Sequence, residues 1–234
     1  MKVKLRGDTW ESLFPHAFTL MDEVRKHGGI EPFWTFGGGT VLMLRYDHRL
    51  SRDIDLFVPD PQYIGYVTPR LSDVAEAISA DYLEQANFVK LVLDAGEIDI
   101  VAAQNLTENP FEVWEIMGQP VKVETAAEIV AKKLYHRGDR ATARDLFDLA
   151  MVIEREPQAL SAAAPYLGRH ARAFVEQVRA GVPIMREQFN SIRRLGFQLS
   201  FDSCVELAGD FLLGLGGDEL GGSNGGGGFD SPSH

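Results

Sequence analysis

The residues of this chain best suited to chemistry are two aspartates, Asp53 and Asp55, which follow three glycines at 37–39. The aspartates are two positions apart among strand-forming residues, so both carboxylates are expected on one face of a strand. Such carboxylates repel each other unless they are solvated, paired with arginine or bridged by a metal. A few oxygen ligands suit Mg²⁺, so the pair predicts a Mg²⁺ site. A salt bridge to Arg49 or Arg52 is the alternative.

A third carboxylate, Asp99, lies between Ile98 and Ile100 in another predicted strand. If that strand neighbours the first one, Asp99 would complete a metal site with Asp53 and Asp55. It could also accept a proton from an attacking hydroxyl group. The three carboxylates together predict phosphoryl or nucleotidyl transfer.

The glycine turn continues through Gly38, Gly39 and Thr40, between a predicted strand and a predicted helix. Glycines let the backbone approach an anion closely, and the first helical turn presents unpaired N–H groups at the positive end of the helix dipole. Thr40 adds a hydroxyl group. The turn matches neither the dinucleotide-binding fingerprint nor the P-loop. It therefore predicts a phosphate site, with a tight turn that binds nothing as the alternative.

The densest basic cluster of the chain falls between residues 132 and 144 and consists of Lys132, Lys133, His136, Arg137, Arg140 and Arg144. Lys133 and Arg137 are one helical turn apart, as are Arg144 and Asp148. This cluster suits a triphosphate or an RNA backbone. A solvated face with salt bridges between helices is the alternative, and Arg144 is the residue most expected to be structural, through Asp145 or Asp148.

Two other reactive residues are expected to have structural roles. Cys204 lies in an amphipathic pattern with no activating base near it in the sequence, so we expect it in the core. His48 has no acid–base partner at a suitable spacing, so we expect a surface or hydrogen-bonding role.

Strands and helices must position these residues. Strand-forming segments lie at 30–36, 53–58, 87–93, 97–102 and 121–123. Helical periodicity follows residues 8–27, where Pro15 is a candidate boundary between a short helix and a longer one. Further helices are expected from about 69, and at 125–138, 141–154, 166–180, 183–194 and 202–213. Residues 214–228 contain nine glycines, so we expect a disordered tail over 215–234.

The composition is that of an ordinary globular protein. Of 234 residues, 45% are hydrophobic and 24% are charged, which is enough for one core with a helical annex. The net charge of −11 argues against a protein that coats nucleic acid with its whole surface. Neither a membrane-spanning segment nor a signal peptide is visible, so we expect a cytoplasmic protein without membrane contact.

Two blocks of residues resemble a known family. Gly38, Gly39 and Thr40, followed after twelve residues by Asp53 and Asp55, resemble the signature of the nucleotidyltransferase superfamily that includes DNA polymerase β. With residues 49–52 before the aspartates, the string resembles the AbiEii/AbiGii abortive-infection toxins in particular. The second block is similar to that family's lysine and Arg-Asp-x-x-Asp motifs, and contains Glu128, Lys133, Leu134, Arg144, Asp145 and Asp148.

The resemblance implies an α+β nucleotidyltransferase fold, with a small mixed sheet and flanking helices. Residues 1–123 would form the nucleotidyltransferase core, and residues 124–214 would form a helical C-terminal lobe that contributes to the active site. The roles it implies are triphosphate binding by Gly38, Gly39 and Thr40, Mg²⁺ binding by Asp53 and Asp55, nucleotide contact by Lys133, and completion of the site by Asp145 or Asp148. We add Asp99 as a third metal ligand, Arg49 as a nucleotide contact, and Arg137 and Arg140 as acceptor contacts.

The leading hypothesis is an Mg²⁺-dependent enzyme that moves NMP from an NTP to an acceptor hydroxyl. The resemblance implies the toxin of a toxin–antitoxin or phage-defence pair, with the tRNA 3′ end as acceptor and a separate antitoxin protein as partner. One alternative is a nucleotide-binding interaction module without turnover. Another is a nucleotidyltransferase that modifies a small molecule or a protein.

Overall fold

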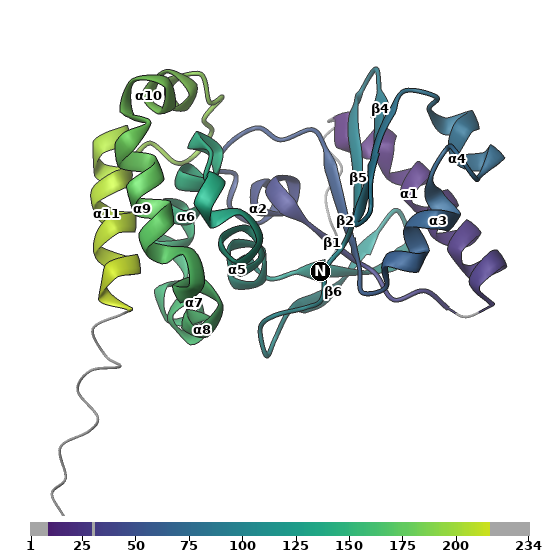
Figure 1. The fold of residues 1–234 in the computed structure, drawn as a ribbon, viewed down its shortest axis with the longest axis horizontal. Helices are drawn as coiled ribbons and strands as arrows, with labels where there is room; N and C mark the ends of the chain where they lie inside the picture. Colours follow the sequence, from purple (N-terminus) through teal and green to yellow (C-terminus); the bar gives the residue numbers. More distant parts are fainter. Residues whose placement is uncertain (1–8, 30, 216–234) are drawn as a thin grey trace, which may run out of the picture.

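The computed structural model describes residues 9–29 and 31–215. A mixed sheet with helices on both faces forms one half of the molecule, and a group of helices forms the other half (Figure 1). The predicted α+β fold is therefore confirmed. The predicted disordered tail lies outside the described residues from position 216 onward.

The sheet has seven strands in the order β3-β4-β5-β2-β1-β7-β6. Their bounds are Thr35–Gly37 for β1, Ile54–Val58 for β2, Tyr82–Gln85 for β3, Phe88–Leu93 for β4, Gly96–Ala102 for β5, Phe111–Ile116 for β6 and Gln119–Glu124 for β7. β2 is parallel to β5 and antiparallel to β1, so the two central aspartate-bearing strands run in the same direction.

The sequence predicted the inner strands better than the outer ones. β2, β4, β5 and β7 lie where strands were expected, but β1 is shorter than the predicted 30–36. β3 and β6 were not predicted, and they are the two edges of the sheet. β3 has no buried residue, and β6 buries only Trp114 and Ile116 while carrying two glutamates, so neither edge strand shows a sustained apolar alternation.

Three helices cover the face of the sheet on the right of Figure 1: α1 (Thr9–Gly28), α3 (Ile64–Val67) and α4 (Asp73–Ile78). α1 continues through Pro15, so the expected boundary there is absent. Buried Phe14 and Ala17 on either side of Pro15 pack into the same core, which offsets the hydrogen bond that proline removes. The helix expected from about 69 begins at Asp73, after Ser72, whose hydroxyl accepts the N–H of Ala75 at 3.2 Å.

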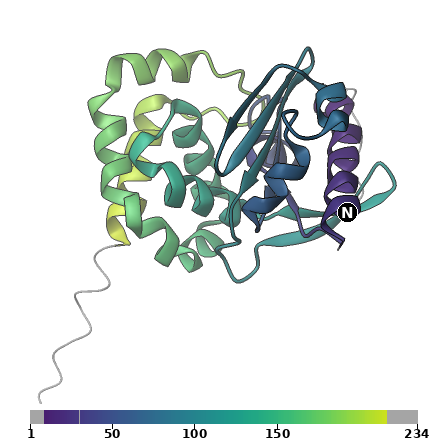
Figure 2. The same ribbon diagram turned by 45° about the vertical axis from the view of Figure 1, so that its right-hand side comes forward.

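α2 (Gly38–Tyr46) and α5 (Ala126–Arg137) lie on the other side of the sheet, and the remaining helices pack beyond them (Figures 1 and 2). These helices are α6 Ala143–Arg155, α7 Pro157–Ala162, α8 Ala164–Leu167, α9 Ala171–Ala180, α10 Val182–Asn190 and α11 Phe201–Gly214. The predicted helices are confirmed with shifted ends, except that the helix expected at 166–180 is divided into α8 and α9 by a 3-10 turn at Gly168–His170. Within the described residues, no helix combines the length and apolar character needed to cross a membrane.

Cys204 is fully buried in α11, as expected of a core residue. Burial raises the pKa of its thiol to about 12. The thiol is therefore protonated at neutral pH and is not a nucleophile.

Residues 47–50, which precede β2, pair with residues 193–196, which precede α11. The N–H of Leu50 donates to the carbonyl of Arg193 at 2.8 Å, and the N–H of Leu195 donates to the carbonyl of His48 at 2.9 Å. The N–H of Gly196 donates to the carbonyl of Asp47 at 2.6 Å. This pairing attaches the end of the helical half to the segment that leads into the aspartate strand.

Phe147 of α6 is the centre of the packing beside these paired segments. Its ring contacts the rings of Phe189 and Phe197 edge to face, with centroids 5.5 and 5.1 Å away, and it stacks on His48 at 5.9 Å. Phe147 therefore joins α6, α10, the segment before α11 and the segment before β2 in one apolar contact.

We expect Phe147→Ala to lower the free energy of unfolding by about 3–5 kcal/mol, because it leaves a cavity at a fully buried site. Urea denaturation measures the loss. Leu213→Ala is the matched control, since Leu213 is 47% exposed and its truncation removes little buried area. Equal losses in the two variants would contradict the central role of Phe147.

Candidate active site

A cavity of about 1050 Å³ opens between the sheet and the helices. Its walls come from the glycine turn, the loop at 49–53, β2, β4, β5, the middle and C-terminal end of α5, the start of α6 and residues 188–193. The cavity thus joins the two blocks of residues that the sequence placed about ninety positions apart. All of the predicted site residues line it except Thr40, Arg140 and Asp148.

The glycine turn is shaped by one carboxylate. Gly38 has a φ of +71°, which favours glycine, and a side chain there would overlap the carboxylate of Asp55. A side chain at Gly39 would overlap the guanidinium of Arg49. These two glycines are therefore required because charged side chains lie directly against the backbone.

Thr40 does not present its hydroxyl to the cavity. The residue is fully buried, and its Oγ1 donates to the carbonyl of Asp53 at 2.5 Å. The expected contact between this hydroxyl and a triphosphate is therefore corrected: Thr40 connects the first turn of α2 to the residue before β2. Only the backbone of the turn faces a ligand.

Asp55 and Asp99 are register partners on the parallel strands β2 and β5. Both line the cavity, whereas Ile54 and Ile98 are fully buried on the other side of the strands. Adjacent strands lie about 4.8 Å apart, so the two carboxylates are close neighbours. Asp53 comes one residue before β2, and its Oδ1 accepts the N–H of Glu97 at 3.0 Å.

Burial and mutual repulsion outweigh the positive charges near this carboxylate pair. Burial raises the pKa of Asp55, and the nearby negative charge of Asp53 acts in the same direction, against Lys133 and Arg137. Burial and the charge of Asp55 raise the pKa of Asp99 to about 7. Each carboxylate therefore makes ionisation of the next one less favourable.

This donor set fits Mg²⁺ through Asp55 and Asp99, because two adjacent carboxylates facing a cavity leave room for water and phosphate ligands. Within residues 9–29 and 31–215, no three His, Cys, Asp or Glu side chains converge closely enough to hold a metal ion. Asp53 is turned toward β5 by its bond to Glu97, and this explains why the three predicted ligands do not meet at one point.

Lys90 of β4 was missed by the sequence analysis. Its Nζ is ion-paired with Glu97 and lies 3.5 Å from Oδ2 of Asp99. The register places Lys90 opposite Asp99. Counting back from the turn predicted at 94–96 would have found this pair.

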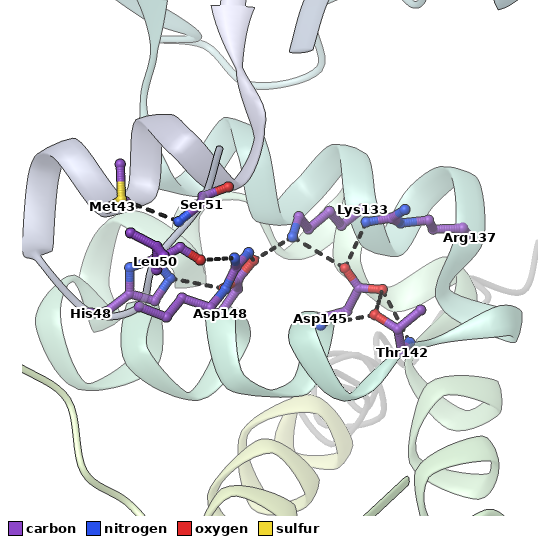
Figure 3. Close-up of polar contacts among 10 residues, drawn as sticks. Met43, His48, Leu50, Ser51, Lys133, Arg137, Thr142, Asp145 and Asp148 are labelled. Carbon is purple, nitrogen blue, oxygen red and sulfur yellow. Dashed lines mark hydrogen bonds and ion pairs between the residues drawn. The ribbon is translucent and has the colours of Figure 1, made fainter. Parts of the chain in front are cut away.

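Asp148 is the buried centre of the second half of the site (Figure 3). Arg49 donates to both of its oxygens, from Nε at 2.6 Å and from Nη2 at 2.8 Å. His48 Nε2 lies 2.9 Å from Oδ1, and Lys133 Nζ is hydrogen-bonded to Oδ2. Burial alone would raise the pKa of Asp148, but Arg49, Lys133 and His48 hold that pKa well below its usual value.

These contacts correct two expectations. Arg49, predicted as a nucleotide contact, is buried in a bidentate pair with Asp148, so it pairs with neither Asp53 nor Asp55 and its role is to position this carboxylate. His48 is fully buried instead of lying at the surface, although the expected hydrogen-bonding role is confirmed. Burial lowers the pKa of His48 despite Asp148, so the imidazole is neutral at pH 7.

Lys133 bridges two carboxylates from one side of the cavity. Besides Asp148, its Nζ contacts Oδ1 of Asp145 at 3.1 Å, and Arg137 Nη2 contacts the same oxygen at 2.7 Å (Figure 3). Asp145 also forms the capping box of α6 with Thr142. Burial opposes ionisation, but Lys133, Arg137 and Thr142 together lower the pKa of Asp145.

Lys132, next in the sequence to Lys133, has a separate buried role. Its Nζ lies 2.5 Å from Oε1 of Glu124 and 3.4 Å from Oε1 of Glu128, and it stands 4.3 Å from the centre of the Phe57 ring. Lys132 is 3% exposed, against 12% for Lys133. Lys133 is therefore the more accessible of the two lysines.

The remaining arginines of the basic cluster differ from expectation. Arg144, expected to be structural through Asp145 or Asp148, is exposed at the cavity and forms no ion pair with a described residue. Arg140 is 75% exposed, lies 3.6 Å from Asp139, and is outside the cavity lining. Arg137 lines the cavity, but Asp145 holds it.

We expect Asp148→Asn to lower the free energy of unfolding by about 3–5 kcal/mol, because it leaves the Arg49 guanidinium buried without its counter-charge. Urea denaturation at pH 7 measures the effect. Asp202→Asn is the matched control, since Asp202 also binds an arginine at two oxygens but is exposed to solvent, and its loss should change little.

The difference between the wild type and Asp148→Asn should also depend on pH. A carboxylate whose pKa is lowered by folding stabilises the protein above its unfolded pKa of about 3.9, and loses that contribution as the pH falls toward the folded pKa. The difference should be constant from pH 7 to about pH 5 and shrink below about pH 4. A difference that grew on acidification would contradict an ionised Asp148.

Comparison with known proteins bears on what this cavity does. The family model described as "Nucleotidyl transferase AbiEii toxin, Type IV TA system" matches residues 19–211. No curated protein sequence matches the chain.

Three solved structures are distantly similar to it. The nucleotidyltransferase toxin MenT4 from Mycobacterium tuberculosis H37Rv is 17% identical, with 92% of this chain and 88% of that chain covered and a TM-score of 0.49. JHP933 from Helicobacter pylori is 16% identical, with coverages of 88% and 91% and a TM-score of 0.47. ANT(2″)-Ia in complex with adenylyl-2″-tobramycin is 18% identical, with coverages of 78% and 98% and a TM-score of 0.40.

The assignment rests on the family model, which spans the glycine turn, both aspartate strands and the helices through α10 and most of α11. It implies an NTP as substrate and an antitoxin as partner. The chain belongs to the AbiEii family of nucleotidyltransferase toxins.

Proposed function

We propose that this protein is a cytoplasmic enzyme that uses Mg²⁺ to transfer NMP from an NTP to the 3′ hydroxyl of an RNA, with tRNA as the first candidate. One observation carries the proposal. The backbone of the Gly38–Gly39 turn, the Asp55–Asp99 pair and Lys133 all face the same cavity, although they come from separate elements. A nucleotidyltransferase needs these three functions within reach of one triphosphate.

The nucleotide binds between the glycine turn and Lys133. The turn offers backbone N–H groups at the start of α2, and Lys133 offers a cation to the phosphates. Asp55 and Asp99 would hold Mg²⁺, with Asp53 supporting them; when bound, the ion would supply charge neutralisation for the triphosphate. In this scheme the core at 1–123 and the helical lobe at 124–214 each contribute one side of the site.

The carboxylates around the cavity have two further roles in this reaction: proton acceptance and the positioning of Lys133. Asp99 lines the cavity beside Asp55 and is the carboxylate placed to accept the proton of the attacking hydroxyl. Asp145 and Asp148 hold Lys133 in place from the other wall. The tRNA acceptor and the abortive-infection role are those that the family resemblance implies, and MenT4 is itself described as a nucleotidyltransferase toxin.

We expect Asp55→Asn to reduce NMP transfer by about 10³-fold, because removing a ligand charge costs several kcal/mol of transition-state stabilisation. The assay incubates the purified protein with Mg²⁺, each labelled NTP and total RNA, and measures label in RNA. Asp210→Asn is the control, since Asp210 is exposed on α11 and outside the cavity lining; its transfer rate should equal that of the wild type.

Three results would contradict parts of the proposal. Transfer unaffected by Asp55→Asn would exclude the carboxylate site. Nucleotide binding without transfer to any acceptor would indicate an interaction module. Label in a protein or a small molecule, with none in RNA, would retain the enzyme and replace its acceptor.

A further inference from the structure

Three arginines of the cavity have no counter-charge. Arg52, Arg144 and Arg193 line it and are exposed, and no carboxylate of the described residues lies within ion-pair distance of them. The other strongly basic residues of the cavity are all paired with carboxylates: Arg49, Lys90, Lys132, Lys133 and Arg137. The cavity therefore carries positive charge that no described side chain neutralises.

Contacts near the cavity relate the segments that carry the three arginines. The carbonyl of Arg193 accepts the N–H of Leu50, which lies two residues before Arg52. Arg144 lies one helical turn before Asp148, which binds Arg49. Three segments far apart in the sequence thus each contribute an arginine to the lining of the cavity.

Like charges that share one cavity without counter-charges disfavour one another, and a bound anion would relieve this repulsion. Solvated arginines scattered over a surface would need no explanation. These three arginines instead line one cavity in a chain whose net charge is −11. The pairing of residues 47–50 with 193–196 holds the backbone at Arg193 beside that cavity. Arginine also offers the donor geometry that binds phosphate at two oxygens.

We propose that Arg52, Arg144 and Arg193 bind the phosphodiester backbone of the RNA acceptor next to its reacting 3′ end. This inference rests on the proposed function. The cavity of about 1050 Å³ slightly exceeds the usual range of about 300–1000 Å³ for a single small ligand, which leaves room for a second substrate. The acceptor role expected of Arg137 and Arg140 passes to these arginines, because Asp145 holds Arg137 and Arg140 lies outside the cavity lining.

The test compares Arg52→Gln, Arg144→Gln, Arg193→Gln and the triple variant with the wild type. Arg172→Gln is the matched control, because Arg172 is exposed on α9 and outside the cavity lining. The probe is a short fluorescent single-stranded RNA with a free 3′ hydroxyl, and anisotropy gives its Kd over a range of salt concentrations. Transfer assays give KM for this RNA and for the NTP separately, and thermal melting confirms folding.

Each single variant should raise the Kd and KM for RNA about tenfold, and the triple variant should raise them by at least about 100-fold. The slope of log Kd against log salt should fall by about 2 in the triple variant, since each phosphate contact on a single strand contributes about 0.7. KM for the NTP should change by less than about twofold. Arg172→Gln should match the wild type in every measurement.

If RNA is labelled but the triple variant keeps the wild-type KM and Kd for RNA, the arginine assignment is wrong and the proposed function stands. A rise in KM for the NTP alone would assign the arginines to the triphosphate and overturn the inference. If the wild type neither binds nor labels RNA, both the inference and the RNA acceptor are wrong. If labelled NMP is found on a protein and none on RNA, both the inference and the RNA acceptor are likewise wrong.

Discussion

The buried carboxylate of Asp148 is the interaction on which the rest of the structure depends. Taking an ion out of water costs several kcal/mol, and only several well-placed partners offset that cost. Here the partners come from both halves of the molecule, with Arg49 and His48 from the segment before β2 and Lys133 from α5. Satisfying this one charge therefore sets the distance between the sheet and the helices, and with it the width of the cavity.

The same contact organises the charges of the cavity into two groups. Asp148 and Asp145 form ion pairs with Lys133 and Arg137 of α5 and with Arg49, whereas Asp55 and Asp99 face the cavity from the sheet with raised pKa values. A nucleotide phosphate that reaches Lys133 must compete with two carboxylates that already hold it. Lys133 is thus held by its own counter-ions, Asp145 and Asp148, at the wall of the cavity.

Local sequence patterns could identify the parts of this site but not all of their partners. The alternation around Asp55, the glycine turn and the spacing of Lys133 and Arg137 are local, and the structure places these residues around one cavity. Arg49 and Asp148 are 99 positions apart, so no sequence periodicity could show that Arg49 forms a buried ion pair with Asp148. Thr40 was misjudged for a similar reason, because its acceptor is a backbone carbonyl 13 residues away.

The helical half of the chain is more than an annex to the sheet. The residues that carry the family resemblance end near α6, yet residues 193–196, far beyond it, hydrogen-bond to the segment that leads into β2. Strand and helix periodicity cannot reveal this pairing, because both segments lie outside regular elements. The family match through residue 211 is consistent with a cavity wall that requires residues 188–193. Because the loop before Asp53 is held by backbone bonds to the segment before α11, the packing of the last helices controls how accurately the carboxylates are placed.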